Sequence, residues 1–130
     1  MELKKRYEWM HRGSTCGMVV SCHGEEGDFT WCVYALVYEN HPEFSNPEKL
    51  IESLPFHRGC TYDEKYSTAP ARGIRYDWQK EHSWLKIGCD YHHYGDDYYQ
   101  SLNPEDGLPQ CIINDAQKIF NSLNGVENDH

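Results

Sequence analysis

The sequence predicts an α+β fold, a mostly antiparallel sheet with a short middle helix and a C-terminal amphipathic helix packed on it. Three observations support this fold class. Two neighbouring runs rich in β-branched and aromatic residues flank a turn, further strand-like runs follow, and the apolar residues adopt a helical period from residue 109 onward. A chain of 130 residues has the size of one domain, so we expect residues 1–130 to form a single domain.

The first predicted elements are two strands joined by a turn. Residues 17–22 and 29–38 are rich in Val, Tyr and Trp, and residues 24–28 between them read Gly-Glu-Glu-Gly-Asp, which is typical of a turn. This pattern predicts a β-hairpin. Residues 1–12 carry a local charge of +2, and we expect them to form a frayed N-terminus or a first helix.

A short helix is predicted over residues 46–54. Asn46 is a good N-cap, Pro47 suits the first helical position, and residues 50, 51 and 54 are apolar on one helical face.

Two more strands and a final helix complete the predicted fold. Residues 60–62 and 84–90 have strand-like composition, and the polar stretch between them, with Pro70 and Gly73, is expected to be a loop. The last helix begins near Pro109 and ends near Gly125. Its apolar residues form one stripe: Ile112, Ile113, Ala116, Ile119, Phe120 and Leu123.

The charge balance restricts the class of partner. Twelve Lys and Arg against 21 Asp and Glu give a net charge of −9, which argues against nonspecific binding to nucleic-acid backbone or anionic membranes. No apolar run approaches the roughly 20 residues of a membrane span, and the charged start lacks a secretory signal. We therefore expect a cytoplasmic protein whose six cysteines are thiols or metal ligands rather than disulfides.

Residues 96–106 combine aromatic side chains with carboxylates and contain no cation. This segment is either a solvated loop or a contact face for a Lys/Arg-rich protein surface, on which tyrosines would anchor and carboxylates would steer the partner. The candidate contact residues are Asp97, Tyr98, Tyr99, Glu105 and Asp106.

The strongest candidate site is rich in His and Asp. Asp90, His93 and Asp96 are spaced three apart, so in a helical turn or tight loop they could converge on zinc or another divalent transition metal. His57 and His41 are the candidates for the remaining ligands. The alternative is a polar loop whose side chains hydrogen-bond to one another.

The number of ligands would decide what a metal does. Four protein ligands would make the ion structural, whereas His57, Asp90 and His93 with a bound water would permit hydrolysis, with Asp96 or His92 as the general base. No catalytic residue is assigned, because an enzyme is the less favoured interpretation. A Cys/His nucleophilic pair is weaker still, since no sequence feature marks Cys60 or Cys89 as activated.

Three runs, residues 34–44, 57–62 and 84–96, resemble a family of small uncharacterised phage and prophage proteins. The family pattern is a Tyr-bearing strand leading to His-Pro, then His-Gly-Gly-x-Thr-Tyr, then Trp-x-x-Gly-Phe-Asp-x-x-His-x-Gly-Asp. The resemblance covers about half the chain, and it departs from the pattern at Arg58, Cys89 and the additional His92. By position, the polar residues of the pattern fall on His41, His57, Asp90, His93 and Asp96.

The resemblance implies a phage-related origin. Small acidic phage proteins are often inhibitors of bacterial defence systems, and an anti-CRISPR protein that binds an effector nuclease would set negative charge against a basic nucleic-acid channel. The sequence therefore predicts a zinc-binding, noncatalytic inhibitor with a basic protein partner, and a metal-dependent hydrolase is the alternative.

Overall fold

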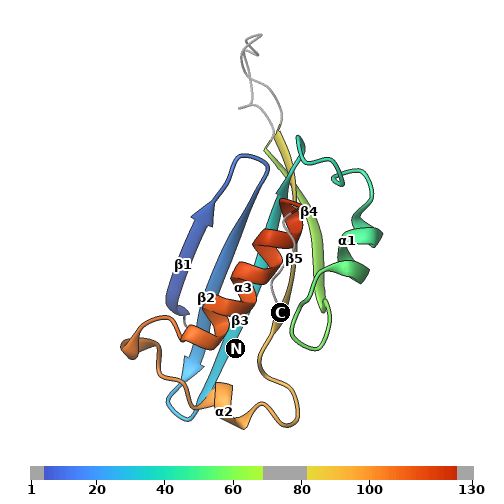
Figure 1. The fold of residues 1–130 in the computed structure, drawn as a ribbon. Coiled ribbons are helices and arrows are strands. Elements are labelled where there is room, and N and C mark those ends of the chain that lie inside the picture. The colour runs from blue at the N-terminus through green and yellow to red at the C-terminus, as the bar shows by residue number, and fades with distance from the viewer. Residues whose placement is uncertain (1–4, 69–81, 126–130) are drawn as a thin grey trace.

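The computed structural model describes residues 5–68 and 82–125 and confirms the α+β fold (Figure 1). Five strands form one antiparallel sheet within these residues, in the order β1-β2-β3-β5-β4. The strands are β1 (Lys5–Arg12), β2 (Cys16–Glu25), β3 (Asp28–Tyr38), β4 (Tyr62–Thr68) and β5 (His82–Asp90). The helices are α1 (Pro47–Ser53), α2 (Asp97–Gln100), the 3-10 helix η1 (Pro104–Asp106) and α3 (Gln110–Leu123).

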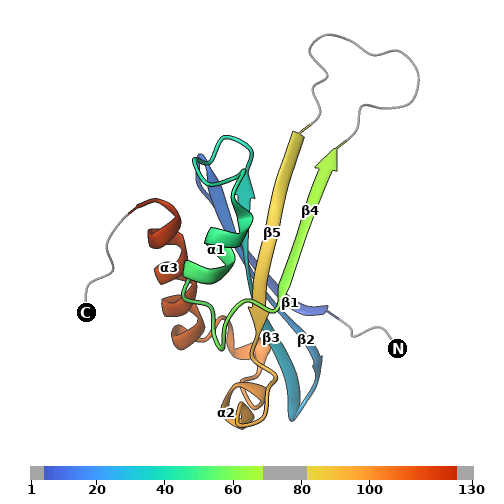
Figure 2. The same cartoon turned by 90° about the vertical axis from the view of Figure 1, so that its right-hand side faces the viewer.

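One face of the sheet carries the hydrophobic core. Val20, Val33 and Cys89 lie side by side in register on β2, β3 and β5, and all three are buried. Because side chains alternate along a strand, every second residue of these strands points the same way. Helix α3 packs across this face (Figures 1 and 2), as the apolar stripe predicted, with these residues buried: Ile112, Ala116, Ile119 and Leu123.

The opposite face of the sheet is half-buried and aromatic. Tyr34 and Tyr38 of β3 point to it, and Figure 2 shows α1 and α3 together on the other side of the sheet. Gly88 of β5 pairs with Tyr34, and a Cβ atom at Gly88 would overlap both the Tyr34 ring and the backbone of Val33. The close approach of this ring therefore requires glycine at position 88.

The local predictions were confirmed where the pattern was strong. Strands β2 and β3 form the predicted hairpin, and α1 and α3 begin and end close to their expected residues. Asn46 occupies the N-cap position of α1 with Pro47 after it, as predicted, but its side chain makes no capping hydrogen bond.

Both outer strands differ from the prediction. Residues 5–12 form strand β1 rather than a frayed end or a helix, because Tyr7 and Trp9 alternate with polar residues and pack against the core. Strand β4 begins at Tyr62, where the predicted strand ended, and extends to Thr68 along β5. The part of the expected loop over 69–81, with Pro70 and Gly73, lies outside the described residues.

No helix in the described part of the chain is long and apolar enough to cross a membrane. All six cysteines are free thiols.

Candidate functional site

The His/Asp cluster lies where β5 ends and the chain turns toward α2. The amide of Tyr91 donates to Trp31 O over 2.8 Å, which fixes the start of this loop to β3. The segment after α1 lies beside the loop, since His57 Nε2 is 2.9 Å from Asp96 Oδ1. Two segments about 40 residues apart therefore build one site.

Asp96 is the centre of the cluster and is only 1% exposed. Its Oδ1 atom lies 2.9 Å from His57 Nε2 and 3.6 Å from Arg58 Nε, and its Oδ2 atom accepts the His93 amide over 2.9 Å. Burial raises the pKa of this carboxyl, but the His93 amide, His57 and Arg58 together outweigh burial and lower it below its ordinary value. Asp96 is therefore a carboxylate at neutral pH.

His57 is held between aromatic rings. Its imidazole stacks on Tyr91, with ring centroids 4.3 Å apart, and contacts the edge of Tyr99 at 5.2 Å. The Tyr91 hydroxyl donates to Asp115 Oδ2 over 2.7 Å, and burial with this acceptor raises the pKa of Tyr91. The Tyr91 ring, on which His57 stacks, is therefore anchored to α3 through its hydroxyl.

Arg58 contacts both Asp96 and the Tyr94 carbonyl at the edge of the site. It has a left-handed backbone, with φ of 57°, and its Nη2 atom donates to Tyr94 O over 2.9 Å. Gly95 also has a positive φ of 94°, and a Cβ atom there would come within 3.1 Å of Arg58 Nη2. Glycine at position 95 therefore permits both the turn and the arginine contact.

A second, more exposed pair lies on the outer side of the same loop. His92 Nε2 is 2.6 Å from Asp28 Oδ1 at the start of β3, and the hydrogen bond to Asp28 raises the pKa of His92. The buried Nε2 of His93 has no hydrogen-bond partner among the described residues, although Asp90 Oδ1 lies 3.3 Å away. A cleft of about 550 Å³ lies beside it, lined in part by His92, His93 and Tyr94.

His41 is the one predicted ligand that lies elsewhere. It is buried after β3, its Nε2 lies 2.7 Å from Leu123 O at the end of α3, and its Nδ1 accepts the Glu43 amide over 3.0 Å. Tyr38 at the end of β3 pairs with the start of β5, whereas Asp90 ends β5, so His41 and the cluster occupy opposite ends of the sheet. The structure therefore does not bring His41 together with the other four predicted ligands.

The geometry of the cluster is that of a hydrogen-bonded network. Both oxygens of Asp96 already accept hydrogen bonds. Within residues 5–68 and 82–125, no three His, Cys, Asp or Glu side chains are placed to hold one ion. Zinc binding stays a prediction. The Cys89 thiol lies beside the cluster, and burial raises its pKa to about 12, which opposes a role as nucleophile.

Four of the five predicted partner-binding residues are exposed: Asp97, Tyr98, Glu105 and Asp106. The fifth, Tyr99, packs against His57 and Tyr91 and is only partly accessible. The sequence did not single out Tyr94, which is fully exposed. A tyrosine between a histidine and a glycine in a loop gave no periodic signal that could have identified it.

The exposed partner-binding residues share one end of the molecule with the β2–β3 turn (Figure 1). The contact between His92 and Asp28 joins this turn to the loop before α2, and Glu26 and Glu105 line the same hollow beside Lys5 and Arg6. We call this surface the acidic end; the exposed cations Lys5 and Arg6 lie beside it, and its exposed acidic and tyrosine residues are Glu25, Glu26, Asp28, Tyr94, Asp97, Tyr98, Glu105 and Asp106.

Comparison of the chain with known protein families, with curated proteins and with solved structures finds no match.

Proposed function

We propose that this chain is a noncatalytic protein-binding module whose acidic end contacts a basic protein surface. The observation that carries the proposal is the convergence of exposed carboxylates and two exposed tyrosines on one end of the fold. Tyr98 is 63% exposed and Tyr94 fully exposed, and a free tyrosine at a surface is a common anchor of protein interfaces.

The charges at the acidic end are available to a partner. Arg6 donates to Gly24 O and Lys5 pairs with Glu8, so within the described residues neither cation forms an ion pair with Glu26 or Glu105, although all four line one hollow. Carboxylates that remain unpaired attract a basic surface over a distance of about 10 Å at physiological salt and accelerate its association.

The most specific form of the proposal rests on the phage resemblance. In this form the protein is an anti-CRISPR protein of the host-cell cytoplasm, which occupies the basic nucleic-acid channel of a CRISPR effector nuclease. The tyrosines would contact the channel wall and the carboxylates would take the place of phosphates.

The test is inhibition of effector nucleases from plausible bacterial hosts by the purified chain, with direct binding measured at two salt concentrations. Reversing charge in the double variant Asp97→Lys, Glu105→Lys should weaken binding about tenfold or more at low salt. The matched control is Glu52→Lys, which reverses an exposed charge on α1 and should leave binding unchanged. Absence of binding to every nuclease, or equal binding by the double variant, would contradict the proposal.

A second candidate, a metal-dependent hydrolase, is favoured by the unpartnered Nε2 of His93 next to Asp90 and an open cleft. These two side chains supply an imidazole nitrogen and a carboxylate, which are ordinary zinc ligands. The described residues place no third ligand with them, so we derive no reaction step through an ion.

Metal content and the number of protein ligands test the hydrolase. Protein purified without chelator should contain stoichiometric zinc if this second proposal holds, and His93→Ala should lose it. His41→Ala removes a histidine that lies apart from the cluster and should retain the metal. A metal-free wild type, or an ion with four protein ligands, would exclude the hydrolase.

A further inference from the structure

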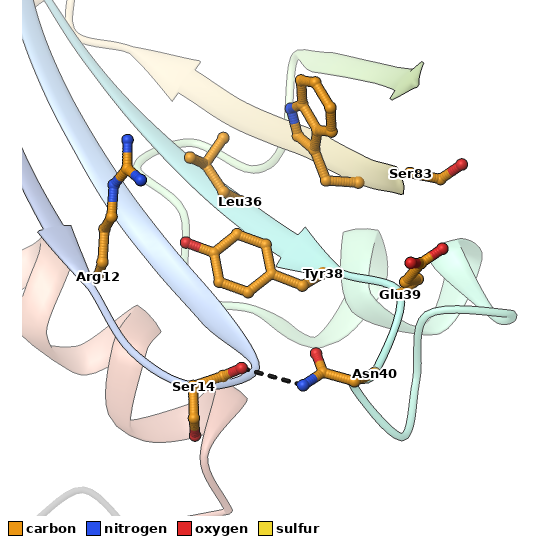
Figure 3. A pocket seen from close by; sticks show the side chains of 8 residues that line it. Arg12, Ser14, Leu36, Tyr38, Glu39, Asn40 and Ser83 are labelled. Atoms are coloured by element: carbon orange, nitrogen blue, oxygen red, sulfur yellow. Dashed lines mark hydrogen bonds between the residues drawn. The ribbon is translucent and has the colours of Figure 1, made fainter. Parts of the chain in front are cut away.

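A pocket of about 600 Å³ lies on the face of the sheet opposite α1 and α3, where β3 ends and β5 begins (Figure 3). The His/Asp cluster lies at the other end of β5. Its walls include Leu36, Tyr38 and Trp84, and its rim carries Arg12, Glu39 and Asn40. Ligand pockets in proteins have volumes of roughly 300–1,000 Å³, with largely apolar walls and a few polar groups. The size and lining of this pocket match that description.

The hollow depends on a missing side chain. Gly17 of β2 lies in register between Arg12 of β1 and Leu36 of β3. A Cβ atom at Gly17 would come within 2.8 Å of the Tyr38 hydroxyl and 2.9 Å of His11 O. Glycine at position 17 therefore lets the Tyr38 hydroxyl lie against β2, which sets the position of this wall of the pocket.

One aromatic wall is held in a fixed orientation. Trp84 of β5 is directly opposite Tyr38 in register, and its ring stacks on Tyr66 with centroids 5.7 Å apart and an interplanar angle of 13°. Because Tyr66 supports the indole, Trp84 offers a flat surface that loses little conformational freedom when a ring binds.

The rim is held together by hydrogen bonds between two loops. Asn40 Nδ2 donates to Ser14 O over 3.0 Å, which orients the Asn40 amide, and the Tyr38 amide donates to Thr15 O over 3.0 Å. Figure 3 shows Arg12 on one side of the pocket and Glu39 on the other. No carboxylate in the described part of the chain pairs with Arg12, which leaves its guanidinium open to an anion.

From this arrangement we infer that the pocket binds a nucleoside monophosphate, with the base against Trp84 and Tyr38 and the phosphate on Arg12. A guanidinium binds phosphate in a bidentate manner, and aromatic side chains stack on bases irrespective of sequence. The oriented Asn40 amide can accept from an amino group on the base. Among the described residues that line the pocket, Arg12 is the one cation and Glu39 adds a carboxylate, so this lining favours a ligand with a single phosphate over a polyphosphate.

The experiment is calorimetric titration of the full chain with AMP, adenosine and ribose 5-phosphate. AMP should bind, and the two fragments should each bind about tenfold more weakly or worse, because each lacks one of the two contacts. Indole-3-acetate, a flat ring with a carboxylate, tests whether the pocket accepts any aromatic anion. Binding of indole-3-acetate without binding of AMP would overturn the assignment, as would absence of AMP binding at millimolar concentration.

Arg12→Gln should reduce AMP affinity to that of adenosine. Arg12 is exposed at the end of β1, so the variant should melt like the wild type, which a thermal scan checks. Lys5→Gln removes an exposed cation from the other end of the same strand and should bind AMP normally. Equal AMP binding by wild type and Arg12→Gln would overturn the inference.

Discussion

Two His–Asp pairs each have one member in the loop between β5 and α2, and their surroundings differ sharply. His57 and Asp96 are 2.9 Å apart, with the aspartate side chain 2% exposed, whereas His92 and Asp28 are 2.6 Å apart, with the aspartate 71% exposed. The shorter contact is the weaker one, because solvent screens an exposed pair and makes its contribution small. Burial, rather than distance, decides which pair stabilises the fold.

The difference has a structural origin. Asp96 accepts from the His93 amide as well as from His57, and His57 is stacked between aromatic rings. Asp28 begins β3 directly after a turn, and its partner His92 is itself exposed.

The largest effect is expected for Asp96→Ala. Removal of the buried carboxylate leaves His57 and the His93 amide without their acceptor, and should lower the free energy of unfolding by about 3 kcal/mol. Urea denaturation measures this change. Asp28→Ala, the matched variant of the exposed pair, should change it by less than about 0.5 kcal/mol. Similar losses in both variants would show that burial does not distinguish the pairs.

The next largest loss of stability is expected for a change at Tyr91, on which His57 stacks. Tyr91→Phe removes the hydroxyl that donates to Asp115 and should cost about 1.5 kcal/mol, as for other hydrogen bonds to charged acceptors. Tyr94→Phe removes a hydroxyl from a fully exposed ring and should leave the denaturation midpoint unchanged. If both variants unfold at the wild-type midpoint, the Tyr91 hydroxyl does not support the cluster.

The buried pair should also make stability fall in acid. The pKa of Asp96 is lower in the folded chain than in the unfolded chain, where an aspartate carboxyl has a pKa of about 4. Its contribution is therefore present above about pH 4 and is lost as pH falls through the lower folded-state pKa. Denaturation of wild type and Asp96→Asn from neutral pH into acid measures this loss. The variant should lose less stability than the wild type over that range.

The smallest effect concerns the exposed pair at higher pH. The pKa of His92 is raised in the folded chain, so its contribution is complete below the unfolded value of about 6.5 and is lost as pH rises through the folded value. NMR titration of His92 should show the raised pKa in wild type and a lower one in Asp28→Asn. An unchanged His92 titration in that variant would mean that Asp28 is not the cause.

The elements predicted well from sequence are those with local patterns. The hairpin of β2 and β3 has its turn between its strands, and α3 has a complete apolar stripe, so neither needs distant partners to be recognised. Strand β1 was missed and β4 was predicted only up to Tyr62, because they are the outer strands of the sheet. Their polar outward residues resemble loop sequence, and only pairing with β2 and β5 makes them strands.

The candidate site was predicted in part for the same reason. Spacing along one loop selected Asp90, His93 and Asp96, and the structure brings them together with His57. His41 was selected by its position next to a predicted element, but the antiparallel register carries it to the other end of the sheet. Sequence spacing identifies neighbours within a loop, whereas a contact between loops depends on topology.

Gly88 has a consequence for evolution. Every residue other than glycine would push the Tyr34 ring off β5 and strain the backbone of Val33 at the centre of the sheet, so substitution here should be selected against regardless of function. The acidic end is free of such a restriction, and its residues can change as a partner changes. Among relatives that keep this fold, position 88 should remain glycine even where the charged surface has diverged, which makes it a marker of common descent rather than of shared activity.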